Sequence, residues 1–214
     1  MARYSLWNDD YWLLLLQIYL KKPVGVKPLY SKPLVDLSLE LHIAPAELYE
    51  RLFELRQRNT PRMQKLWETY GEHPRKLSNR VKTLRKKAGF GSNGTFFEGV
   101  ELNESFEKDF RPVDGDSIMP IQLIMILDLY FRLTPNTMVV ETPEIIELSN
   151  LIKIPVERIV EIMSIYQQID PCLHRDTTID DPLLPACQKI WNRYGNDNPQ
   201  RLAALAAQLK DYFA

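Results

Sequence analysis

The sequence contains few of the residues on which metal, redox and disulfide chemistry depend. Its 214 residues include only two cysteines, Cys172 and Cys187, and three histidines, His42, His73 and His174. Two cysteines cannot form a disulfide framework or a four-thiolate zinc site. The histidines are scattered along the chain, which limits histidine-based chemistry. We therefore expect no metal and no cofactor, and a chain that is not an enzyme.

Long apolar runs are also missing. The longest, over residues 11–20, is only about half the length that a bilayer demands, and Gln17 interrupts it. No charged region followed by a small-residue cleavage site marks the N-terminus as a signal peptide. The composition, 45% hydrophobic and 26% charged, is that of a soluble globular protein. We predict a cytoplasmic chain that has no membrane partner.

The two halves of the chain carry opposite net charges. Residues 1–90 hold 17 Lys and Arg against 9 Asp and Glu, a balance of +8. Residues 91–214 hold 10 against 19, a balance of −9. A single uniform domain would not divide its charge in this way. The asymmetry predicts two modules that face different partners, or that face each other.

The sequence repeats itself at a spacing of 111 residues. Residues 13–55 align without a gap with residues 124–166, and nearly every apolar position meets an apolar position. Further on, QKLWETYGEHPRKL matches QKIWNRYGNDNPQRL with one inserted residue, so that Trp67 meets Trp191. A motif that recurs in register at two places indicates a duplication.

The sequence pattern of each copy predicts a series of helices. Residues 11–20 and 123–131 are almost wholly apolar, which predicts a buried central helix in each copy. Thr142 followed by Pro143 is typical of a helix start with a capping hydroxyl. Between the copies, TFFEGVEL and ESFEKDFRPV have β-type content, which predicts a short hairpin or extended arm. The predicted fold is mainly α, a tandem repeat of a helix-turn-helix-containing bundle: a basic repeat over 1–90, a β-like linker over 91–115 and an acidic repeat over 116–214.

Two helical segments in each copy are separated by a break of about three residues, the spacing of a helix-turn-helix. Ser38 and Ser149 are small residues inside the first segments. Ile43 and Ile154 follow five residues later, and we expect their side chains to fill the space under the turn. The second segments lie at about 45–58 and 155–168. Helix pairs with short turns occur in any bundle, so a purely architectural role is the alternative to one that faces DNA.

The second copy also carries a series of family motifs. An apolar helix ends in Leu129-Tyr130, a P-E-I-I-E-L helix starts at Pro143, and Asp170-Pro171 and Trp191 follow. In this order they resemble the helical domain at the N-terminus of many bacterial HNH-family endonucleases, over about 90 residues. The resemblance implies a bacterial, nucleic-acid-related module.

The departures from that family qualify the resemblance. Lys153-Ile154-Pro155 stands where the family usually has Gly-Arg-Thr-Pro, and Glu157 and Glu161 follow it, although phosphate would repel their carboxylates. The first copy matches more weakly and lacks the Asp-Pro. We expect a relative of this domain without the nuclease half, in which the second copy does not bind DNA through that helix.

The sharpest functional candidate is a run of seven cations with no carboxylate between them. At helical spacing they cover one broad face, and Leu77, Val81 and Leu84 form the apolar stripe of the same helix. Phosphate would complement this face, and so would an acidic protein surface. A plain solvated face is the third interpretation. The candidate nucleic-acid-binding residues are Arg75, Lys76, Arg80, Lys82, Arg85, Lys86 and Lys87, assisted by Arg51, Arg56 and Arg58.

We predict a non-catalytic protein of regulatory or defence type that binds nucleic acid, with duplex DNA as the favoured partner. The alternative is a protein–protein interaction scaffold in which the repeats mediate dimerisation. Because the halves have opposite charges, the acidic repeat can also mask the basic one, within one molecule or across a homodimer.

Overall fold

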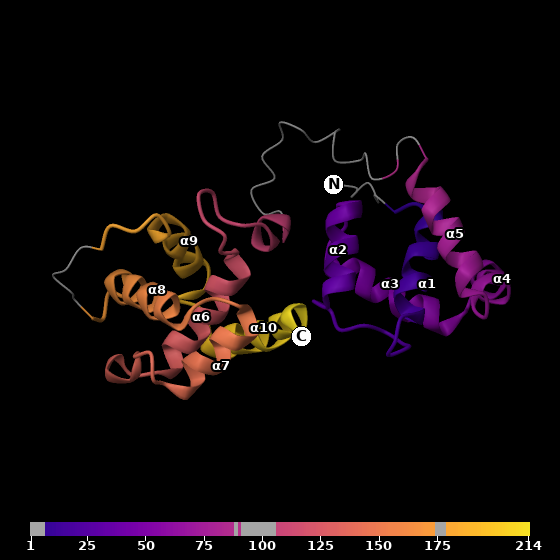
Figure 1. The fold of residues 1–214 in the computed structure, drawn as a ribbon. Helices are drawn as coiled ribbons and strands as arrows, with labels where there is room; N and C mark the ends of the chain where they lie inside the picture. Colours follow the sequence, from indigo (N-terminus) through magenta and orange to yellow (C-terminus); the bar gives the residue numbers. More distant parts are fainter. Residues whose placement is uncertain (1–6, 88–89, 91–105, 174–178) are drawn as a thin grey trace. The chain divides into compact units, whose positions relative to one another are not determined.

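The computed structural model describes residues 7–87, 90, 106–173 and 179–214, and it divides into two units, residues 1–104 and 105–214 (Figure 1). The described residues form ten α-helices and no strand, so the predicted, mainly helical fold is confirmed. None of the described helices is both long enough and apolar enough to cross a membrane.

Unit 1 is built around its first helix. It contains a 3-10 turn, η1 (Asp9–Tyr11), followed by α1 (Trp12–Leu20), α2 (Lys32–Leu41), α3 (Pro45–Gln57), α4 (Pro61–Tyr70) and α5 (Pro74–Arg85). Helix α1 packs on α2, α3 and α5, and its side chains from Trp12 to Leu16 are buried. A helix that is apolar on every side is stable only where other helices surround it.

Unit 2 has the same plan around its own first helix. It consists of η3 (Phe106–Phe110), α6 (Pro120–Arg132), η4 (Pro135–Thr137), α7 (Pro143–Ile152), α8 (Val156–Ile169), α9 (Leu184–Tyr194) and α10 (Pro199–Phe213). Helix α6 packs on α7, α8, α9 and α10. At its centre Tyr166 is fully buried, and its hydroxyl donates a hydrogen bond to the Leu123 carbonyl at 3.0 Å.

The helices of the two units have matching bounds. Helix α7 begins and ends 111 residues after α2, α8 begins 111 residues after α3, and α10 begins 125 residues after α5. A clear difference in packing concerns α4 and α9. Helix α9 packs on α6 and α8 and buries Cys187, Ile190 and Trp191, whereas α4 packs on α5 and buries only Met63.

The turns after α2 and α7 are alike in backbone but differ in the contacts of their serines. His42 and Lys153 end these helices in the left-handed conformation, with φ of 56° and 60°. In unit 1 the amide of Ile43 donates to the Ser38 carbonyl at 3.2 Å. In unit 2 the Ser149 hydroxyl donates to the Ile154 carbonyl at 2.6 Å. The predicted serines and isoleucines therefore do lie at the two turns.

The repeated W-x-x-Y-G motif has a steric basis. Each tryptophan lies directly over the glycine four residues later. A Cβ atom on Gly195 would meet the Trp191 ring at 2.7 Å, and one on Gly71 would meet the Trp67 carbonyl oxygen at 2.6 Å. Real Cβ atoms do not approach other atoms this closely, so only glycine fits either site.

Replacing Gly195 with alanine should therefore lower the free energy of unfolding by about 1–3 kcal/mol, the cost of overpacking against the Trp191 ring. Urea unfolding of the full chain measures the change. Asn196→Ala, one residue further on and exposed, is the control and should stay within about 0.5 kcal/mol. Equal stability of Gly195→Ala and the unmodified chain would contradict the steric argument.

Two local predictions are wrong. Residues 106–110 form the 3-10 helix η3 rather than an extended arm, because Phe110 is buried and its ring centroid lies 5.3 Å from that of Tyr212. The TFFEGVEL segment of the predicted linker lies outside the described residues. Thr142 precedes α7 but does not cap it with its side chain, since its hydroxyl donates instead to the Thr137 carbonyl.

Candidate nucleic-acid interface

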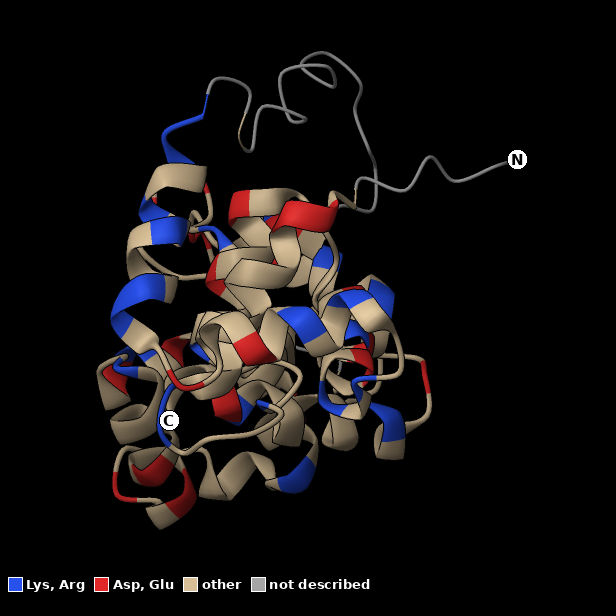
Figure 2. Cartoon of the chain, turned by 90° about the vertical axis from the view of Figure 1, so that its right-hand side faces the viewer, with Lys and Arg blue, Asp and Glu red and all other residues tan. Residues whose placement is uncertain are grey.

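Helix α5 presents the predicted cations on its solvent side. Its apolar side chains Leu77, Val81 and Leu84 are buried, and the helix packs on α1. Residues three and four apart share a helix face, so the row opposite the buried one points to solvent. That row consists of Arg75, Asn79, Lys82 and Lys86, all exposed. We call it the basic stripe; Figure 2 shows Lys and Arg recurring along this helix up to its end at the grey trace.

Other parts of unit 1 neutralise two of the seven cations. Arg85 forms a bidentate ion pair with Glu40 of α2, in which Nε and Nη2 donate to the two carboxylate oxygens at 2.6 and 2.7 Å. Lys87 pairs with Asp10 of η1 at 2.8 Å. The sequence has no carboxylate within the run, but the fold brings these two to it. Arg85 and Lys87 therefore help to hold α5 against α2 and η1.

The remaining cations of α5 are not neutralised by ion pairs within the part of the chain that the structure describes. No residue that the structure describes forms an ion pair with the three cations of the basic stripe or with Arg80. Lys76 lies with its Nζ 5.5 Å from the centroid of the Tyr70 ring, a cation–π contact that leaves the charge in place. Helix α5 thus combines five cations without a carboxylate partner among the described residues.

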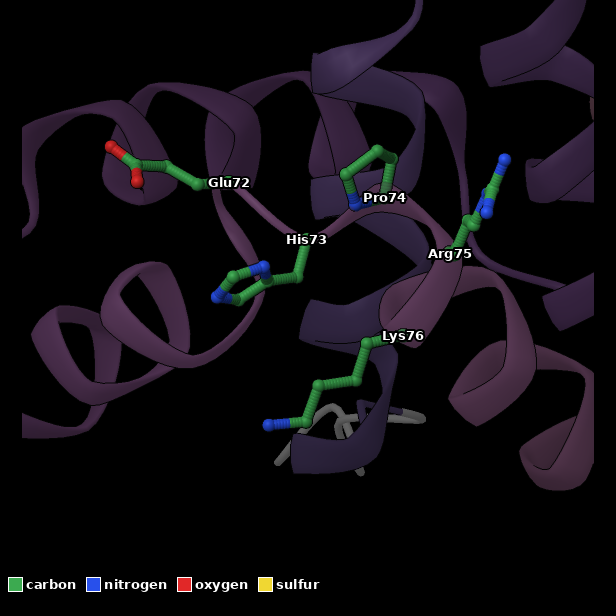
Figure 3. Close-up of a pocket in the computed structure, with 5 residues that line it drawn as sticks. All are labelled: Glu72, His73, Pro74, Arg75 and Lys76. Carbon is green, nitrogen blue, oxygen red and sulfur yellow. The ribbon is translucent and has the colours of Figure 1, made fainter.

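A hollow of about 490 Å³ lies where α4 ends and α5 begins. Glu72, His73, Pro74, Arg75 and Lys76 line it. In Figure 3 the His73 ring and the Lys76 side chain extend to the same side, while Arg75 points away from them. The start of a helix carries partial positive charge, which adds to that of these cations.

The three assisting arginines are placed differently from one another. Arg51 is held by Glu47 at 3.2 Å, and its guanidinium lies 4.1 Å from the centroid of the Trp7 ring. Arg58 lies 4.0 Å from the centroid of the Trp67 ring. Arg56 is exposed at the end of α3. The structure thus ties Arg51 and Arg58 to the fold of unit 1 itself.

Helix α3, the second segment of the predicted helix-turn-helix in unit 1, has an acidic outer surface. Glu50 and Glu54 are exposed, and Glu54 lies 3.9 Å from Arg51. Phe53, between them, is 39% exposed. Carboxylates repel phosphate, so the charge of unit 1 favours α5 over α3 as the surface for a nucleic acid.

The matching helix of unit 2 lacks the basic stripe. With the offset of 125 residues, Leu202, Ala206 and Leu209 form the buried face of α10, as Leu77, Val81 and Leu84 do in α5. The residues of α10 that correspond to the stripe are Gln200, Ala204, Ala207 and Asp211. The packing of this helix therefore does not require cations, and their presence on α5 needs another explanation.

An arginine on α8 of unit 2 contacts three carboxylates. Arg158 contacts Asp181 at 2.7 Å, Glu161 at 2.8 Å and Asp116 at 3.5 Å. The hydrogen bond from Arg158 lowers the pKa of the Asp181 carboxyl, and the same bond raises the pKa of Arg158. These contacts connect α8 with the segment before α9.

Because its pKa is lowered by folding, Asp181 stabilises the folded state at pH values above the pKa of the unfolded chain. That contribution is lost as the pH falls through the lowered pKa of the folded state. Asp181→Asn should cost about 1–3 kcal/mol of unfolding free energy at pH 7, and less at pH 3. Urea unfolding at the two pH values tests this. Asp180→Asn is the matched control because Asp180 is exposed; an equal loss at both pH values in Asp181→Asn would refute the ion-pair argument.

The two cysteines, which are the remaining reactive side chains, differ in their surroundings. Cys187 is buried, and burial raises the pKa of its thiol to about 12, so it is protonated at neutral pH. Cys172 is exposed. Within the described ranges, no three side chains of His, Cys, Asp or Glu come together as a metal site.

Lys65 and Tyr70, which lie near the cations of α5, were not among the predicted site residues. Both are on α4, and together with Arg80 they line a groove between α4 and α5. Tyr70 belongs to the repeated W-x-x-Y-G motif, which indicated only the duplication. No sequence signal brings α4 beside α5; only the packing of the two helices does so.

The described residues form two units of five α-helices each, and one unit carries a basic helix. No family model matches the chain, and neither does any curated protein or solved structure. The resemblance to the helical domain of HNH-family endonucleases stays a prediction.

Proposed function

We propose that this chain is a non-catalytic nucleic-acid-binding protein of regulatory or defence type, and that unit 1 holds the phosphates through the basic stripe. One observation carries the proposal. Helices α5 and α10 bury matching faces, yet only α5 carries cations along the row opposite its buried face. Since packing does not demand these cations, we assign them to an anionic partner.

The length of the basic stripe suits a nucleic-acid backbone. From Arg75 to Lys86 the helix rises by about 16 Å, and successive phosphates of one strand of a duplex are about 3.4 Å apart along the axis. The three cations can therefore contact separate phosphates. The contacts are to phosphate alone, which gives affinity without sequence selection.

We also propose that the two units are copies of one helix-turn-helix-containing unit. Support comes from the matching helix bounds, the left-handed turns at His42 and Lys153, and the tryptophan over glycine in both units. After such a duplication, unit 1 would have acquired the basic stripe and unit 2 its acidic balance. The relationship to the HNH-associated domain is part of this proposal.

A protein scaffold is the second candidate, and one observation favours it. Unit 2 exposes several large apolar side chains: Phe131, Val139, Val140 and Ile146, each between 39% and 44% exposed. Apolar side chains of this kind are typical of protein interfaces when they form a patch. A dimer seen by sedimentation at micromolar concentration, lost in Val139→Ser/Ile146→Ser, would favour this function.

The salt dependence of binding tests the nucleic-acid proposal. The full chain is titrated with a fluorescein-labelled 20-base-pair duplex of arbitrary sequence between 50 and 200 mM NaCl. With three to four phosphate contacts, log K should fall with log[salt] at a slope of about −3 to −4, a loss of roughly 50- to 200-fold over this range. Absence of binding at 50 mM salt, or a slope near zero, would refute the proposal.

A further inference from the structure

A groove beside α5 combines an apolar floor with a charged rim. It has a volume of about 280 Å³ and lies between η1, α1, α4 and the middle of α5. Trp12, Met63 and Leu66 supply apolar side chains, Tyr70 supplies an aromatic ring, and Arg80 reaches it from α5. We call this the α4 groove.

The charge of the rim is positive. The two acidic residues of the α4 groove, Asp9 and Asp10, are each held in an ion pair by a cation of unit 1. Lys65 and Arg80 are exposed, and neither forms an ion pair with any residue of the described ranges. An anionic group is therefore attracted to the rim, while the floor favours an apolar body.

The α4 groove is a consequence of how α4 packs. Helix α9, its counterpart in unit 2, rests on α6 and α8 and buries Ile190 and Trp191. Helix α4 buries only Met63 and leaves Leu66 and Tyr70 partly exposed. Apolar and aromatic surface thus stays accessible next to the helix that carries the cations.

We propose that the α4 groove takes one unpaired base of a single-stranded nucleic acid whose backbone follows α5; this inference rests on the proposed function. The volume is slightly below that of pockets for drug-sized ligands, about 300–1,000 Å³, and suits a single flat ring system. The Tyr70 ring offers a stacking surface, as aromatic side chains do in single-strand-binding proteins. Lys76 and Arg80, one turn apart, are placed to hold the adjacent phosphates.

An oligonucleotide without bases separates this inference from the proposed function. The full chain is titrated at 100 mM salt with a 12-residue oligothymidylate and with an abasic strand of the same length and charge. The oligothymidylate should bind roughly 5- to 100-fold more tightly, the effect of one base–aromatic stack. Tyr70→Leu keeps an apolar side chain without the flat ring, and it should remove most of that preference. Tyr194→Leu, the same position of the motif in unit 2, is the matched control and should keep it.

The outcomes distinguish the two proposals. If the unmodified chain binds both strands equally and with a salt-dependent affinity, the base site is refuted. The proposed phosphate contacts of the basic stripe are then unaffected. If neither strand nor the duplex binds, both are refuted. Thymidine monophosphate that displaces the oligonucleotide at an equal nucleotide concentration would overturn the assignment to a strand. Thr69→Phe, which fills the groove from α4, should reproduce the loss seen in Tyr70→Leu; unchanged preference in both variants overturns the inference.

Discussion

Replacing Arg75, Lys82 and Lys86 together with glutamine should weaken binding of the full chain to a generic duplex by roughly 100-fold at 50 mM salt, about 2.7 kcal/mol. The salt slope should fall in magnitude by about 3, because three phosphate contacts no longer release counterions. Fluorescence anisotropy at several salt concentrations measures both quantities. The three side chains are exposed, so the unfolding free energy should change by less than about 0.5 kcal/mol per site.

The control for this variant changes the net charge by the same amount elsewhere. Lys153, Lys189 and Lys210 are exposed residues of unit 2, and their joint replacement with glutamine should reduce the affinity only slightly. If the two triple variants lose affinity equally, net charge rather than the basic stripe governs binding. The assignment of the phosphate surface to α5 would then be wrong.

The variant Arg85→Gln serves as a second comparison within α5. Arg85 is already engaged by Glu40, so removing it takes away less attraction for phosphate than removing a stripe residue. Its loss should instead appear in the unfolding free energy, by up to about 1 kcal/mol as is usual for exposed pairs. The seven cations of the run are thus not equivalent, although the sequence presents them as one group.

Much of the helical architecture follows from local rules that the sequence displays. Proline occupies the first turn of α5, α7 and α10, where its missing amide costs nothing. The spacing of apolar residues on α5 predicts its buried face, and that face is buried in the structure. Such features depend on neighbours in sequence, so the start of α7 and the buried face of α5 could be predicted.

Contacts between helices were not predictable in the same way. Nothing near Arg51 in the sequence indicates that the Trp7 ring lies against its guanidinium, or that Asp10 lies beside Lys87. Each of these pairs joins residues more than 40 positions apart, and it decides whether a cation is available to a ligand. The extended arm predicted for ESFEKDFRPV, residues 104–113, was wrong over 106–110 for a related reason. Its β-type composition does not show that Phe110 packs on Tyr212.

Transferring the basic stripe to α10 is the most demanding test of the phosphate surface. In the chain that lacks the stripe cations of α5, Gln200→Arg, Ala207→Lys and Asp211→Lys place three cations on the corresponding row of α10. All three positions lie on the side opposite Leu202, Ala206 and Leu209, which are buried. The substitutions therefore leave the buried face of α10 intact, and they should restore duplex affinity by roughly 100-fold.

A matched control decides what such a rescue means. Asn136→Lys, Asp180→Lys and Gln188→Lys raise the net charge of unit 2 by the same four units, at exposed positions that do not form a row on one helix. If a row of cations on a helix face is sufficient, the transferred stripe restores both affinity and salt slope, and the scattered cations restore much less. Equal rescue by both would attribute binding to net charge. Rescue by neither would mean that α5 needs a neighbour that α10 lacks, and α4 with its open groove is the helix whose packing differs between the units.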